Sequence, residues 1–181
     1  AGIPVILDSK RGDIASTALA YARETFDAFG ADAVTLAPYM GWDSISPFTD
    51  NYPGKGFYIL CKTSNKSSGD IQDLHADGEP VYIRVAELVC RNHVPGIGVV
   101  TGATYPGQLS RILDTFSKAH KPAGLLIPGI GRQGGDIEAV MSALVQSEDY
   151  RIHRINSSSA INYAWKNGNI APEKFAWAAV N

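Results

Sequence analysis

The sequence has few cysteines, no long apolar run and no marked excess of charge of either sign. Its 181 residues include only two cysteines, Cys61 and Cys90. So few thiols favour free cysteines in a reducing compartment over a disulfide framework. No apolar run approaches the ~18 residues that a membrane-spanning helix needs. The N-terminus lacks the basic and apolar regions of a secretory signal peptide, so we expect a cytoplasmic protein.

The charge balance excludes a strongly basic nucleic-acid surface. Lysine and arginine number 16 against 18 acidic residues, and domains that bind nucleic acids usually concentrate positive charge. The four histidines show no H-x-H or H-x3-H spacing, so we predict no metal site. With 45% hydrophobic residues, residues 1–181 suit a single domain with a substantial core.

Short apolar runs alternate with longer amphipathic stretches along the whole chain. We predict strands near residues 4–8, 33–37, 56–62, 98–102, 124–128 and 151–156, each followed by helical sequence. This alternation indicates a parallel sheet covered by helices. Two closures fit the pattern: an open doubly wound sheet, which six units would suit, and a (β/α)8 barrel, which would be two units short.

Charged, hydroxyl and glycine residues gather where the predicted strands end. Those ends read DSK, APYMG, KTSN, TGAT, PGIGRQGG and NSSS, after apolar strand bodies. In both architectures ligands bind at the carboxyl ends of the strands, so we expect the functional site there. Gly134 and Gly135 precede a helix predicted to start near Asp136, where backbone N–H groups can face an anion. A tight turn without a ligand is the alternative.

The first predicted strand ends in a dense charged cluster, "VILDSKRGDI". Side chains two apart on a strand point the same way, so Asp8 and Lys10 should project together. In one interpretation Asp13 caps a helix and Asp8–Lys10 is a strand-end ion pair. In the other, the three residues form a buried carboxylate–ammonium–carboxylate array that keeps Lys10 charged.

The same cluster resembles a family motif. "LDSKRGDIAST" is similar to the D-x-K-x-x-D-I-x-x-T signature of orotidine 5′-phosphate decarboxylases, although D-x-K-x-x-D also occurs in related barrel enzymes such as hexulose-phosphate synthases. "ADAVTLAPYMGWDSISPF", "TSN", "IPGIGRQGGD" and "INSSSAINYA" resemble, in the same order, the longer decarboxylase subfamily. The resemblance implies a (β/α)8 TIM barrel without its first two strand–helix units, so that the chain starts at the third strand.

The resemblance also implies a reaction and a set of catalytic residues. The enzyme would convert orotidine 5′-monophosphate to uridine 5′-monophosphate in de novo pyrimidine biosynthesis, with no metal or cofactor. Lys10 would stabilise the carbanion at C6 and protonate it, and Asp8 would hold Lys10. Asp13, Ile14 and Thr17 would reach the partner's site across a homodimer interface.

The remaining residues implied by the resemblance would hold the nucleotide. Ser64, in a polar loop expected to close as a lid, would contact the pyrimidine edge, and Pro128 would line the pyrimidine pocket. Gln133 with Gly134 would hold the phosphate. The family's phosphate-binding arginine is Ser159 here, which carries no charge and cannot make a bidentate contact.

Several alternatives stay open. Arg132, where the family commonly has a small residue, either replaces the lost cation or points to solvent. The missing units would carry a substrate-binding aspartate and a second lysine, so we expect the proton-donating half of the reaction centre without a complete site. The chain would then be a fragment, or be completed by another polypeptide, or be a remnant. Besides the decarboxylase, a metal-dependent sugar-phosphate lyase or synthase and a non-catalytic phosphate-binding remnant fit the sequence.

Overall fold

Six parallel strands form the main sheet of the computed structural model, which describes residues 2–130, 134–147, 150–167 and 170–180. The strands are β1 (Ile6–Arg11), β2 (Ala33–Leu36), β3 (Gly56–Lys62), β6 (Ile97–Thr101), β7 (Gly124–Ile127) and β8 (Arg154–Ile155). All six predicted strands are confirmed, with shifted bounds. Their spatial order is their chain order, β1-β2-β3-β6-β7-β8. A doubly wound sheet reverses its order at a switch point, so this sheet is part of a barrel wall.

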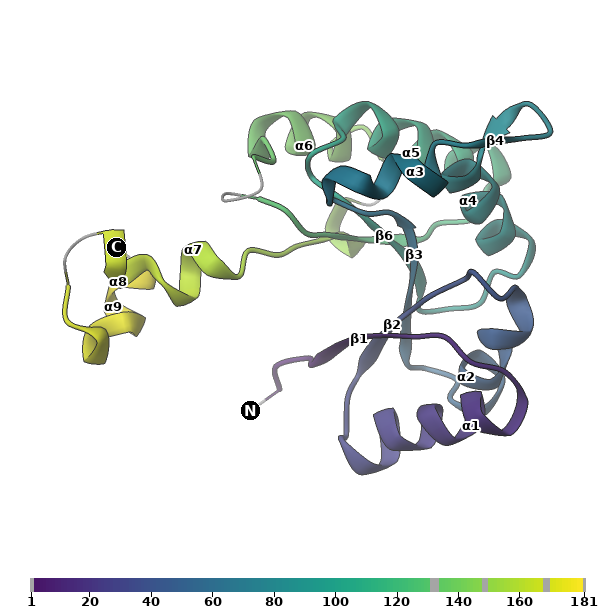
Figure 1. The fold of residues 1–181 in the computed structure, drawn as a ribbon, viewed down its shortest axis with the longest axis horizontal. Coiled ribbons are helices and arrows are strands. Elements are labelled where there is room, and N and C mark those ends of the chain that lie inside the picture. Colours follow the sequence, from purple (N-terminus) through teal and green to yellow (C-terminus); the bar gives the residue numbers. More distant parts are fainter. Residues whose placement is uncertain (1, 131–133, 148–149, 168–169, 181) are drawn as a thin grey trace.

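Helices connect the strands and cover one face of the sheet (Figure 1). The longer ones are α1 (Ala15–Arg23), continued by the π-helical segment Glu24–Ala28, α4 (Val81–Arg91), α5 (Pro106–Ala119) and α6 (Ile137–Leu144). The shorter ones are α2 (Ser46–Asn51), α3 (Gly69–Gln72), α7 (Ser159–Asn162), α8 (Ala164–Asn167) and α9 (Phe175–Val180), with 3-10 turns at Trp42–Ser44, Lys66–Ser68, Tyr150–Ile152 and Pro172–Lys174. A small hairpin, β4 (His75–Ala76) and β5 (Glu79–Pro80), precedes α4. In the described residues, no helix combines the length and apolarity that crossing a membrane requires.

The core lies between the sheet and these helices. Alternate strand residues point into it, as the two-residue period of a strand requires; they include Val34, Leu36, Phe57, Ile59, Val99, Leu125 and Ile127. They pack against helix residues that include Ala18, Ala22, Phe48, Ala86, Leu109, Ile112 and Val140. The strand residues between them face the other side of the sheet, which would be the interior of a closed barrel.

The last helices stand apart from this body. In Figure 1, α7, α8 and α9 (yellow) lie away from the helices that cover the sheet. They pack mainly against one another, and Phe175, Trp177 and Val180 remain exposed. Ser159, at the start of α7, is carried away from the sheet with them.

Candidate active site

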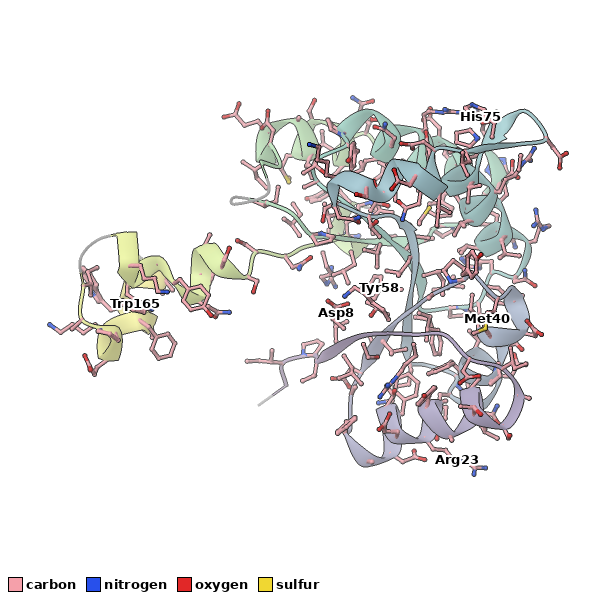
Figure 2. All side chains as sticks on the ribbon, in the orientation of Figure 1. Asp8, Arg23, Met40, Tyr58, His75 and Trp165 are labelled. Carbon is pink, nitrogen blue, oxygen red and sulfur yellow. The ribbon has the colours of Figure 1, made fainter. Side chains whose placement is uncertain are left out.

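Asp8 and Lys10 form an ion pair on β1. The Lys10 Nζ lies 2.7 Å from the Asp8 Oδ1. Thr35, fully buried on the neighbouring strand β2, binds both residues: its hydroxyl donates to Asp8 Oδ1 and accepts the Lys10 N–H, each at 2.9 Å. In Figure 2, Asp8 projects from β1 away from helix α1. One buried hydroxyl therefore fixes the carboxylate and the lysine backbone together.

A bulge in β1 sets the direction of Lys10. The β1–β2 register shifts between Leu7, which pairs with Val34, and Arg11, which pairs with Leu36. Lys10 has a φ of +51°, a left-handed conformation that is costly for a residue with a side chain. Asp8 and Lys10 thus pair as the two-residue period predicted, but across a bulge, and β1 continues to Arg11 rather than ending at Asp8.

The pair is more exposed than a buried array would be. The Asp8 and Lys10 side chains are 61% and 50% exposed, because β1 is an edge strand of the sheet. An exposed pair of this kind contributes about 0–1 kcal/mol to folding. In the described chain, Asp8 and Lys10 form an exposed ion pair on β1, and water screens their charges.

Asp13 does not cap the helix that follows, so that part of the first interpretation is wrong. The N-cap of α1 is Ile14, which has no side-chain cap, and the Asp13 carboxylate accepts the Ile14 N–H at 2.8 Å. Ile14 is 48% exposed, and Thr17 is also exposed in the first turn of α1. These three residues point to a surface that a second molecule can reach.

Ser64 packs against the end of β6. A Cβ on Gly102 would lie 2.6 Å from the Ser64 Cα, so only glycine permits this approach. The Thr104 hydroxyl donates to the Ser64 carbonyl at 3.2 Å. Between them, Ala103 donates its N–H to the Pro128 carbonyl at 2.8 Å. Residues 102–104 therefore bring the Ser64 and Pro128 segments together, as strand ends at one edge of a barrel should be.

The glycine turn after β7 is tightly built. A Cβ on Gly135 would lie 2.6 Å from both the Ala103 Cβ and the Gly129 carbonyl oxygen, and Gly134 has a φ of +83°. The helix α6 starts next to Asp136, as predicted, and Asp136 is its N-cap: the Asp136 carboxylate accepts the N–H groups of the second and third helix residues. The Gly135 N–H donates to the Gly129 carbonyl at 3.0 Å. Several amides that an anion could use are therefore already engaged.

The predicted phosphate ligands are only partly placed. Gln133 and Arg132 lie outside the described residues. The Asn156 N–H donates to the Ile127 carbonyl at 3.1 Å, which ties the start of the last motif to the end of β7. Ser159 follows three residues later, at the start of α7, and its carbonyl accepts the Tyr163 N–H. The described structure thus leaves Ser159 on the outlying helices.

Two further residues at this edge were not predicted as site residues. Thr35 is a polar residue inside the buried strand sequence "AVTL". A polar residue in an otherwise apolar strand is the feature of the sequence that could have identified it. Lys62, the last residue of β3, is fully buried although lysine is rarely so. No group of three or more potential metal ligands occurs among the residues that the structure describes.

Tyr58 lies on the face of the sheet opposite the helices, nearer the start of β3 than its carboxyl end. Gly98 on the neighbouring strand β6 and Gly124 on the next strand, β7, leave room for its ring: a Cβ on Gly98 would lie 3.1 Å from the ring edge. Partial burial raises the pKa of Tyr58, and the positive charge of Arg154 opposes that rise. Tyr58 is therefore a neutral phenol at physiological pH and helps to fill the barrel interior.

Comparisons with known proteins agree on one family. The family model described as "Orotidine 5'-phosphate decarboxylase / HUMPS family" matches residues 1–161. An orotidine 5′-phosphate decarboxylase from Roseiflexus castenholzii is 47% identical over 173 residues, which cover 94% of this chain and 61% of that protein. The chain therefore spans about three fifths of the length of this curated relative.

Solved structures give the same result. The UMP synthase of Leishmania donovani is 43% identical with a TM-score of 0.80, covering 89% of this chain and 35% of its own. The OMP decarboxylase of the same organism is 40% identical with a TM-score of 0.78, covering 98% of this chain and 66% of its own.

Proposed function

The chain belongs to the orotidine 5′-phosphate decarboxylase / HUMPS family, and from this we propose that it acts in the decarboxylation of orotidine 5′-monophosphate to uridine 5′-monophosphate. The observation that supports this proposal most is the Asp8–Lys10 pair, held at 2.7 Å by the buried hydroxyl of Thr35. A lysine fixed beside a carboxylate at a strand end can stabilise developing negative charge and then deliver a proton.

In the proposed reaction, the bond between C6 and the substrate carboxylate breaks and carbon dioxide leaves. The electron pair stays on C6, where the Lys10 ammonium stabilises it and then transfers a proton to it. Lys10 becomes a neutral amine and takes up a proton from solvent. Asp8 holds Lys10 in place beforehand and crowds the departing carboxylate. No metal or cofactor is needed for this sequence of steps.

The other predicted residues would bind the nucleotide. Ser64 would contact the pyrimidine edge and Pro128 would line the pyrimidine pocket; the contacts of residues 102–104 with both segments support a shared pocket. Gly134, with Gln133 and Ser159, would lie toward the phosphate. The engaged amides of the glycine turn and the outlying position of Ser159 imply that this end must rearrange to bind phosphate tightly.

A homodimer with shared sites, which the family resemblance implies, would cover the exposed Asp8–Lys10 pair. Water weakens the electrostatic effect of Lys10 on a carbanion, so efficient chemistry needs a cover over this region. A second copy that inserts Asp13, Ile14 and Thr17 would supply one, because all three lie near the start of α1, outside the helix-packed core. A second carboxylate beside Lys10 would also strengthen the preference for its charged form.

A substrate comparison with and without a chelator tests the proposed function. Consumption of orotidine 5′-monophosphate should proceed at the same rate with and without EDTA. A metal-dependent conversion of a sugar phosphate, abolished by EDTA, would instead support a lyase or synthase of the same barrel group. Binding of a 6-substituted uridine monophosphate without any turnover of orotidine 5′-monophosphate would support a non-catalytic remnant.

A further inference from the structure

Lys62 places a fully buried ammonium group next to the candidate site. It is the last residue of β3 and one of the largest completely buried side chains. Burying a lone ammonium is costly, so its partners must compensate. Both carboxylate oxygens of Asp73 lie 2.9 Å from the Lys62 Nζ, the Ser68 hydroxyl lies at 3.0 Å, and the ring centre of Tyr105 lies at 4.5 Å.

These partners belong to the segment that carries Ser64 and to the strand end that it packs on. Ser68 closes the 3-10 turn Lys66–Ser68, and Asp73 is the C-cap of α3. Tyr105, before α5, directs its hydroxyl to the Asn65 carbonyl at 3.4 Å. The Lys62 ammonium therefore attaches residues 66–73 to the end of β3.

The other hydrogen bonds of this segment join polar groups. The Gln72 side-chain oxygen accepts the Thr63 N–H at 2.9 Å, and Thr104 binds the Ser64 carbonyl. Ile71 and Leu74 are exposed, at 54% and 57%, so little apolar burial holds the segment. With so few apolar contacts, the charge-assisted bonds of Lys62 are the strongest attachment of the segment.

We propose that Lys62 is a positioning residue that fixes the 63–73 segment through Asp73 and Ser68 and so sets where Ser64 meets the pyrimidine. This inference rests on the proposed function for the role of Ser64. Lys62 itself does not touch the nucleotide, because its ammonium is enclosed by Asp73, Ser68 and Tyr105. The segment predicted as a closing lid would thus be attached at its base by an ion pair whose acidic partner is 46% exposed.

The test uses Lys62→Met, which keeps most of the unbranched apolar stem of the side chain and removes the charged amino group with its hydrogen bonds to Asp73 and Ser68. The released Asp73 can turn to water, so the substitution should leave the fold intact. Asp73→Asn, on the half-exposed partner, provides a second variant if Lys62→Met does not fold. Lys55→Met is the matched control, because Lys55 precedes the same strand and contacts the Ala31 carbonyl at 2.7 Å and Asp32 at 3.8 Å, away from Ser64.

The first measurement is amide hydrogen exchange of the full chain. Exchange of residues 63–73 should accelerate about tenfold or more in Lys62→Met and Asp73→Asn, as loss of charge-assisted hydrogen bonds predicts, while α6 stays unchanged. Lys55→Met should leave residues 63–73 as in the wild type. Unchanged exchange of this segment in both Lys62→Met and Asp73→Asn would overturn the proposal.

The second measurement is a double-mutant cycle on affinity for uridine 5′-monophosphate. Lys62→Met should weaken binding about tenfold in the wild-type background and have no further effect in Ser64→Ala, because it acts through Ser64. Affinity for ribose 5-phosphate, which lacks the pyrimidine, should not change. An equal loss in both backgrounds would overturn the proposal. A wild-type chain that binds no uridine 5′-monophosphate would refute the proposed function, and hydrogen exchange would then decide on Lys62 alone.

Discussion

Replacing Thr35 with valine should release the Asp8–Lys10 pair without disturbing the strand. Valine is also β-branched and similar in shape, so β2 keeps its packing, and the change replaces the hydroxyl with a methyl group. That hydroxyl makes two hydrogen bonds of 2.9 Å, one of them to a carboxylate. A neutral bond contributes about 1 kcal/mol and one to a charged group about 1.5–3 kcal/mol. Because Asp8 and Lys10 are half-exposed, water replaces part of this loss, and we expect unfolding free energy to fall by about 1–2 kcal/mol.

Urea denaturation and amide exchange of Lys10 would measure the effect. Thr35→Val should lower the urea midpoint and speed exchange of the Lys10 amide. Thr35→Ser, which keeps the hydroxyl, should have a urea midpoint and a Lys10 exchange rate close to those of the wild type. Thr101→Val is the matched control on β6: Thr101 is also fully buried, but its hydroxyl has no hydrogen-bond partner in the described structure. That substitution should be neutral or stabilising.

A Thr35→Val variant as stable as the wild type, with a protected Lys10 amide, would refute this account of the bulge. Equal destabilisation by Thr35→Val and Thr101→Val would show that any buried threonine has the same effect and that the Asp8 and Lys10 contacts are irrelevant. If the account is correct, turnover of orotidine 5′-monophosphate should fall in Thr35→Val with little change in KM, because Lys10 is displaced rather than the nucleotide pocket.

Three further predictions concern the dimer, the strand-end pocket and the core. Mixing Asp13→Ala with Lys10→Ala protein should restore about a quarter of wild-type turnover, since half of the dimers are hybrids with one intact site; no recovery on mixing would contradict shared sites. Gly102→Ala should weaken binding of uridine 5′-monophosphate, because its Cβ would displace Ser64; unchanged affinity measured by calorimetry would contradict the packing. Burial raises the pKa of the Cys61 thiol, so the folded state resists ionisation and stability should fall by about 1.4 kcal/mol per pH unit above the unfolded thiol pKa of about 8.5. In urea denaturation, the unfolding free energy of Cys61→Ala should depend less steeply on pH than that of the wild type, and the tyrosines, which titrate in both proteins, should not contribute to the difference. Equal slopes in the two proteins would show that Cys61 is not the source.

The sequence pattern located the strands because strands buried in a parallel sheet are apolar along their length, as in "GFYILC" and "GIGVV". It could not decide between a doubly wound sheet and a barrel, because strand order depends on contacts between distant residues. The unbroken order from β1 to β8 supplies that information. Likewise, the spacing of Asp8 and Lys10 predicted their pairing, but the bulge depends on Thr35, which lies on another strand.

Exposure of the site was the hardest property to predict. Whether Asp8 is buried depends on what lies beside β1, and no local pattern records that. Lys62 looked like an ordinary charge at a strand end because its partner Asp73 is 11 residues away. Only the folding of the polar loop into a 3-10 turn and α3 brings the two together.

The role proposed for Lys10 is tested by the rate of carbon dioxide release from orotidine 5′-monophosphate in Lys10→Ala protein. Loss of the group that stabilises and protonates C6 should lower kcat at least about a thousandfold. Lys55→Ala, a lysine at the opposite end of the sheet from the candidate site, should retain the wild-type rate. Carbon dioxide release at equal rates by Lys10→Ala and wild-type protein would contradict the account.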